Sequence, residues 1–148
     1  MIGLLVSGHG SFATGLATSL KLLAGEQANV KFVDFDGQSG DDLKVKIAET
    51  LDTMKEYDGV LVLTDLPGGT PYNKSVELKL ERAAEQTIEV MAGTNLPLLL
   101  SCSTMAGAGI FEAPMDLAQA MLPEAKDSLV VFELETGDDD NDDFGDFI

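Results

Sequence analysis

The chain has 148 residues, 45% of them hydrophobic, which suits one domain with a single sizeable core. Its 26 acidic and 9 basic residues give a formal net charge of −17, which argues against nucleic acid, anionic membranes and substrates held mainly by lysine and arginine. The single cysteine, Cys102, cannot form an intrachain disulfide, which favours a reducing compartment. The first residues lack the positive region of a signal peptide, so we expect a cytoplasmic protein.

Short apolar runs rich in Val, Ile and Leu alternate with helical patterns along the chain. This alternation is typical of βαβ units and predicts an α/β fold around a parallel sheet. The predicted strands lie at 2–7, 30–35, 60–64, 88–92 and 128–134.

The helical patterns lie between these runs. After the third run, Thr70 is a good N-cap and Pro71 a good first residue for a helix that reaches Gln86. A later helix begins near Asn95 or Pro97, breaks at 106–109 and resumes over 113–122. Apolar residues recur at helical spacing in the segments on either side of the third run: Leu43, Ile47, Leu51 and Met54 before it, and Val76, Leu80 and Ala84 after it.

The only histidine, His9, follows the first apolar run and is flanked by Gly8 and Gly10. The third run is likewise followed by a glycine-containing loop, 65–71, which opens with Asp65. Because parallel strands end at the same edge of a sheet, these loops predict one crevice that holds an imidazole, a carboxylate and free backbone N–H groups.

This combination of groups suits phosphoryl transfer. A carboxylate beside an imidazole fixes its tautomer and leaves the other ring nitrogen as a nucleophile, so we expect His9 and Asp65 to be catalytic. N–H groups at a helix N-terminus hold anions. We expect the phosphate to be bound by Gly10, Ser11, Gly68, Gly69 and Thr70.

Other readings of these residues stay open or are disfavoured. His9 could be a structural histidine at a strand end, or part of a sensor that binds a small anion without transfer. A serine triad would lack its nucleophile elbow, and nucleotide hydrolysis would lack a Walker A loop. One His and one Cys cannot supply the usual zinc ligands, so we expect no metal and no other cofactor. Cys102 is expected to be buried as a small hydrophobe.

The last residues form an acidic segment. Residues 137–148 are of low complexity and hold too little apolar area to offset the entropy of ordering, so we expect a disordered tail after a single domain at 1–136.

Several separated motifs, in order, resemble the enzyme IIA domain of the mannose type of the bacterial sugar phosphotransferase system. The resemblance covers about residues 1–134. The motifs are Gly3-Leu4-Leu5-Val6-Ser7-Gly8-His9-Gly10, Leu22-Leu23-Ala24-Gly25-Glu26-Gln27, Asp65-Leu66-Pro67-Gly68-Gly69-Thr70-Pro71-Tyr72-Asn73 and Ala92-Gly93-Thr94-Asn95-Leu96-Pro97.

The resemblance implies a doubly wound, mostly parallel sheet in the order 2-1-3-4, with a last strand exchanged between the subunits of a homodimer. It implies that His9 accepts phosphate from the histidine phosphocarrier protein and passes it to enzyme IIB, which serves the membrane components IIC and IID. It further implies that Asp65 hydrogen-bonds His9 and that Thr70, in place of the family's more usual Ser, lies beside the phosphate.

Two alternatives share part of this pattern. The subunit that phosphorylates dihydroxyacetone kinase has the same fold and histidine, although the first loop here is more similar to the sugar branch. Chelatases of the sirohydrochlorin type have a similar Gly-His-Gly-Ser motif after their first strand. Their chemistry requires further metal-binding histidines, which this chain lacks.

Overall fold

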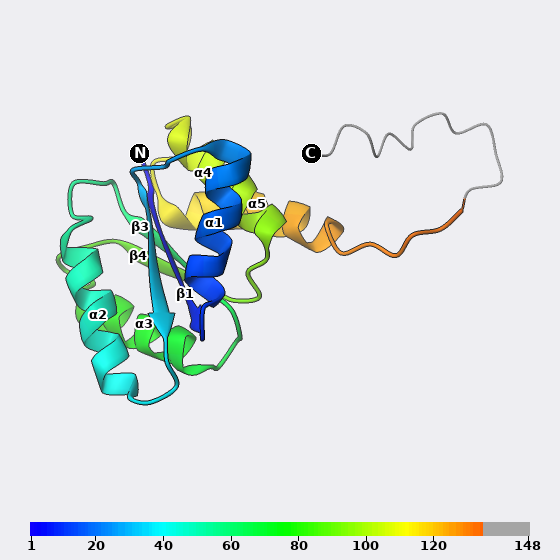
Figure 1. Cartoon of the computed structure of the whole chain (residues 1–148). Helices are drawn as coiled ribbons and strands as arrows, with labels where there is room; N and C mark the ends of the chain where they lie inside the picture. The colour runs from blue at the N-terminus through cyan, green and yellow to red at the C-terminus, as the bar shows by residue number, and fades with distance from the viewer. Residues whose placement is uncertain (135–148) are drawn as a thin grey trace.

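A parallel sheet forms the centre of the molecule. The computed structural model describes residues 1–134 and contains four strands within that range, all parallel, in the order β2-β1-β3-β4 (Figure 1). This is the predicted order. The strands are β1 (Gly3–His9), β2 (Val30–Phe35), β3 (Val60–Thr64) and β4 (Ile88–Met91).

Helices cover both faces of the sheet, which confirms the doubly wound fold. One face packs against α2 (Gly40–Asp52) and α3 (Thr70–Glu81). The other packs against α1 (Phe12–Ala24), α4 (Leu96–Gly107) and α5 (Pro114–Asp127) (Figure 1). The two layers give two hydrophobic clusters, one on each side of the sheet.

The central strands are buried because both of their faces are covered. Every residue of β3 is buried, and so is β1 from Gly3 to Gly8. This explains why these strands are nearly continuous apolar runs rather than alternating ones. The burial ends at His9, so the histidine is the first residue of β1 to reach the surface.

The helix before β3 matches its predicted pattern. Its predicted apolar positions Leu43, Ile47 and Leu51 are buried, whereas the fourth, Met54, is buried beyond the end of the helix at Asp52. Ser39 caps the helix by accepting a hydrogen bond from the Asp42 N–H at 3.2 Å. The helix after β4 is also as expected. Asn95 is its N-cap and accepts from the Leu98 N–H at 2.9 Å. Helix α1 is not among the predicted elements, because Thr14, Gly15 and Thr18 interrupt its apolar pattern.

The predictions for α3 were wrong in two respects. Its N-cap is Gly69, and Thr70 is already helical without capping the helix through its side chain. Its buried residues are Pro71, Ser75 and Leu78. Of the predicted apolar positions, Val76 is half-buried, Leu80 is exposed, and Ala84 is exposed and lies beyond the end of the helix. The Ser75 hydroxyl can face the core because it donates to the Pro71 carbonyl at 2.7 Å. The helix also ends at Glu81, short of the predicted Gln86.

The segment 128–134, predicted as a strand that is exchanged between subunits, forms no strand within this single chain. Ser128 ends α5 as its C-cap. The following residues extend away from the domain (Figure 1), and Leu129, Val130, Val131 and Leu134 are each at least 80% exposed. A strand needs a neighbouring strand, and among residues 1–134 the sheet contains β1 to β4 alone. The predicted acidic tail, 137–148, lies outside the described residues.

The approach of α1 to β1 depends on Gly8. A Cβ atom at this position would lie 2.4 Å from Cδ1 of Phe12, whereas a Cβ at Gly15 in the exposed middle of α1 would meet nothing within 4 Å. We expect Gly8→Ala to lower the free energy of unfolding by about 1–3 kcal/mol through overpacking. Gly15→Ala should raise it by about 0.5–1 kcal/mol, because alanine favours the helix. Urea unfolding measures both, and equal effects would contradict the close packing at Gly8.

Candidate functional site

The site lies at the carboxyl edge of the sheet, where the neighbouring strands β1 and β3 end. β1 ends at His9, and Asp65 directly follows β3. Ser7 pairs with Thr64 in the register of these strands, so the two predicted catalytic side chains come from adjacent strand ends. Alternation along β1 places His9 on the same face as Leu5, which packs with the residues of α2 and α3.

Asp65 holds His9 by two hydrogen bonds. Its Oδ2 atom lies 2.7 Å from Nδ1 of the His9 ring and accepts the His9 backbone N–H at 2.9 Å. An ionised carboxylate only accepts hydrogen bonds, so Nδ1 carries the proton and Nε2 keeps its lone pair. The predicted contact between His9 and Asp65 is therefore present.

The carboxylate is held in its charged form. Burial of Asp65 raises its pKa, but hydrogen bonds from the His9 N–H, the His9 ring and the Leu66 N–H outweigh this effect. The net result is a pKa of Asp65 below its ordinary value. The negative charge that orients the imidazole is thus available throughout the neutral range.

Packing fixes the plane of the His9 ring while leaving it accessible. The ring makes an edge contact with Phe35, with centroids 5.5 Å apart. On another side it approaches Gly69, where a Cβ atom would lie 3.1 Å from Cε1 of His9. The side chain is nevertheless 43% exposed. A held but accessible imidazole is the arrangement that a nucleophile requires.

His9 opens into a pocket of about 720 Å³ between the end of the sheet and the first turns of α2 and α3. Thr70 is the other predicted site residue that lines it. The remaining lining residues were not predicted: Phe35, Gly37, Gln38, Ser39, Gly40, Asp41 and Lys74. They come from the end of β2, the β2–α2 loop, the start of α2 and α3, which sequence spacing alone does not bring to His9.

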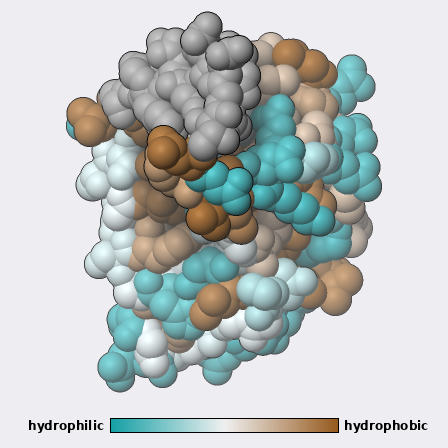
Figure 2. Space-filling view, turned by 90° about the vertical axis from the view of Figure 1, so that its right-hand side faces the viewer, coloured by the Kyte–Doolittle hydropathy of each residue, from teal (hydrophilic) through white to brown (hydrophobic). Residues whose placement is uncertain are grey.

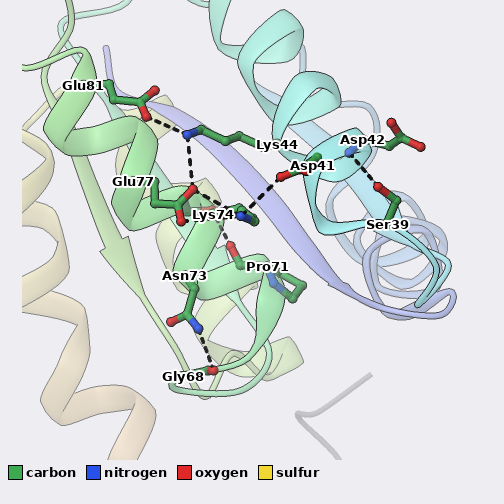
Figure 3. Close-up of polar contacts among 11 residues, drawn as sticks. Ser39, Asp41, Asp42, Lys44, Gly68, Pro71, Asn73, Lys74, Glu77 and Glu81 are labelled. Carbon is green, nitrogen blue, oxygen red and sulfur yellow. Dashed lines mark hydrogen bonds and ion pairs between the residues drawn. The ribbon is translucent and has the colours of Figure 1, made fainter.

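The predicted phosphate-binding residues differ in whether they line the pocket and in whether their backbone N–H groups already have a partner. The backbone N–H of Gly10 already donates to the Phe35 carbonyl at 2.7 Å, and that of Gly69 donates to Leu66 at 3.1 Å. Ser11 is the exposed N-cap of α1 and does not line the pocket. Gly68 has a positive φ of 78°, and its carbonyl accepts from the Asn73 side chain at 3.0 Å (Figure 3). Thr70 thus has the best position of the five.

Cys102 is separate from this site. Its side chain is fully buried in α4, as predicted, and burial raises the pKa of its thiol to about 12. Among residues 1–134, no group of three or more His, Cys, Asp or Glu side chains could hold a metal ion. No helix in the same range is long and apolar enough to cross a membrane.

Comparison with known proteins identifies the family. A family model described as "PTS system fructose IIA component", where PTS is the phosphotransferase system, matches residues 3–132. The chain belongs to this family. As an EIIA component of the mannose, sorbose and fructose type, it is a phosphotransferase that works with other components of the system.

Individual relatives agree with this assignment. The fructose-specific EIIA component of Bacillus subtilis is 38% identical over 101 residues, which cover 68% of this chain and 67% of the relative. The sorbose-specific EIIA component of Lacticaseibacillus casei is 34% identical over 104 residues, which cover 70% of this chain and 72% of the relative. The mannose-specific EIIAB component of Escherichia coli is 33% identical over 67% of this chain, and the match spans 30% of that longer protein.

Solved structures share the fold. The EIIA component from Streptococcus agalactiae has 33% identity and a TM-score of 0.80, with 89% of this chain and 98% of that chain covered. The mannose/sorbose-specific IIA subunit from Enterococcus faecalis, at 23% identity, has a TM-score of 0.76 with 90% and 96% covered.

The hydrogen bond to Asp65 predicts a definite tautomer for His9 of this EIIA component. Long-range ¹H–¹⁵N spectra at pH 8 should show the proton on Nδ1, and the single histidine makes the assignment unambiguous. Asp65→Ala should shift the equilibrium toward the Nε2–H form. A wild-type protein with its proton on Nε2 would contradict the role of Asp65 as the orienting group.

Proposed function

We propose that this chain is a phosphoryl carrier in sugar uptake, which accepts a phosphoryl group on Nε2 of His9 from the histidine phosphocarrier protein and passes it to enzyme IIB. The observation that carries the proposal is the 2.7 Å contact between Nδ1 of His9 and Asp65, which leaves Nε2 as the nucleophile beside an open pocket. Family membership supports it, and the sugar-specific names of the relatives support the sugar branch over the dihydroxyacetone kinase and chelatase alternatives.

The transfer exchanges one nitrogen–phosphorus bond for another. The lone pair on Nε2 of His9 attacks phosphorus, while the bond from phosphorus to the donor imidazole breaks and its electron pair returns to that ring. The His9 ring becomes positively charged, and the carboxylate of Asp65 stabilises this charge through the Nδ1–H hydrogen bond. In the second step His9 is the donor. The acceptor attacks phosphorus, the bond from phosphorus to Nε2 of His9 breaks, and its electron pair returns to the His9 ring.

The N-terminus of α3 provides electrostatic support for the phosphoryl oxygens. Thr70 lines the pocket at the first turn of this helix, where N–H groups have no partner within the helix and the helix dipole favours negative charge. Its hydroxyl is a further donor. Positioning and charge neutralisation of this kind account for most of the catalysis in phosphoryl transfer.

The carrier function is tested with the phosphoenolpyruvate-driven relay and intact-protein mass spectrometry. We expect one added phosphoryl group that is lost on brief acid treatment and absent from His9→Ala, because phosphohistidine is acid-labile. Asp65→Asn should fold yet be phosphorylated about tenfold to a thousandfold more slowly. An acid-stable adduct on Ser7, Ser11 or Thr70 would contradict the proposal, and so would binding of phosphate without covalent modification.

We further propose that the active form is a homodimer in which residues 129–134 pair with the partner subunit. This run is apolar and exposed, and β4 leaves one edge of the sheet free. A groove of about 250 Å³ lies along β4 and α5. Figure 2 shows apolar surface near the point where the C-terminal segment leaves this face of the molecule. An apolar run and an uncovered edge are the two parts that strand exchange joins.

Truncation tests this assembly. A chain that ends at Ser128 keeps the C-cap of α5, so its domain should fold but elute as a monomer or aggregate through the uncovered edge. The matched control ends at Gly137, keeps the apolar run and should remain a dimer. Light scattering after gel filtration measures the mass of both, and a stable dimer of the shorter chain would contradict the exchange.

A further inference from the structure

Lys74 lies in the pocket of His9 although no feature of the motif predicted it. It follows Thr70 by one helical turn on α3, so both residues are on the same face of the helix. Among the described residues that line the pocket, Lys74 is the one lysine or arginine. Lys74 thus shares a pocket with His9, the proposed nucleophile.

Packing at two glycines locates Lys74 relative to the site. A Cβ atom at Gly40 would lie 3.1 Å from Cε of Lys74 and 3.2 Å from Cγ2 of Thr70, so both side chains lie against the start of α2. Gly69, next to Thr70 in sequence, approaches the His9 ring as closely. The end of the Lys74 side chain and the methyl group of Thr70 therefore lie near each other in the pocket that His9 also lines.

The ammonium group of Lys74 is held by long contacts with two carboxylates, and it donates to both oxygens of Glu77. Its Nζ lies 3.7 Å from Asp41, which is 95% exposed, and 3.4 Å from Glu77 (Figure 3). Lys44 bridges the same two helices more tightly, at 3.1 Å from Glu77 and 2.6 Å from Glu81. The Lys74 distances are long for hydrogen-bonded ion pairs and both carboxylates reach solvent, so a change of partner costs Lys74 little.

Release of Lys74 leaves no isolated buried charge. Glu77 keeps its ion pair with Lys44, and the carboxylate of Asp41 is solvated. A phosphoryl group on His9 carries close to two negative charges and three acceptor oxygens, which makes it a stronger partner for an ammonium than one exposed carboxylate. Lysine suits this exchange because its compact charge sits on a flexible stem.

We propose that Lys74 moves from Asp41 and Glu77 to the phosphoryl group on His9, and that it thereby stabilises the phosphorylated form of the protein. This inference rests on the proposed phosphorylation of His9. Lys74 then binds the phosphoryl group in the phosphorylated protein, and it bridges α2 and α3 in the unphosphorylated protein.

The test uses phosphoramidate, a small chemical donor, so that the result does not depend on the donor protein. The pKa of the phosphoryl group on His9 is measured from the pH dependence of its ³¹P chemical shift. Lys74→Ala should raise this pKa by about one unit, because a nearby positive charge is lost. Lys74→Arg should restore most of the wild-type value, since it keeps the charge.

The matched control is Lys44→Ala, which removes ion pairs between the same helices at a residue that does not line the pocket. It should leave the phosphoryl pKa unchanged. Equal pKa values in wild type and Lys74→Ala, an equal shift in Lys44→Ala, or no modification of His9 by phosphoramidate would overturn the inference. Failure of the protein relay on a chain that phosphoramidate does modify would instead count against the proposed function alone.

Discussion

The hydrogen bonds between Asp65 and His9 are the constraint on which the site depends. One carboxylate oxygen accepts both the backbone and the ring N–H of His9, which fixes the strand end and the imidazole together. This is possible because β1 and β3 are neighbours in the sheet although they are separated by β2 and two helices in sequence. The sheet order, rather than any local motif, thus brings the imidazole and its orienting group into contact.

Much of this arrangement was predictable from sequence because it follows from strand ends. The buried runs that end at His9 and Thr64 mark the carboxyl ends of two strands, and parallel strands have these ends at the same edge of the sheet. The face of α3 was not predictable in the same way. Ser75 is buried and Leu80 is 69% exposed, because hydrogen bonding within the helix and packing against α2 decide the orientation, and neither is visible as apolar spacing.

The segment 128–134 shows a different limit of sequence reasoning. Its composition is that of a strand, yet within one chain it is extended and exposed. Strand propensity expresses how well side chains fit a sheet surface, so it predicts a strand only where an edge is within reach. The composition therefore predicts a strand without saying which edge it joins, and the single chain offers it none.

The acidity of the chain disfavours a further negative charge in the pocket. A phosphoryl group would arrive in a protein of formal net charge −17, beside Asp41 and the ionised Asp65. The helix N-terminus at Thr70 offers partial positive charge, and Lys74, which pairs with Asp41 and Glu77 in the same region, offers a full one. For the proposed carrier, this balance of negative and positive groups matters because a phosphoryl group that is bound too tightly would not be passed on.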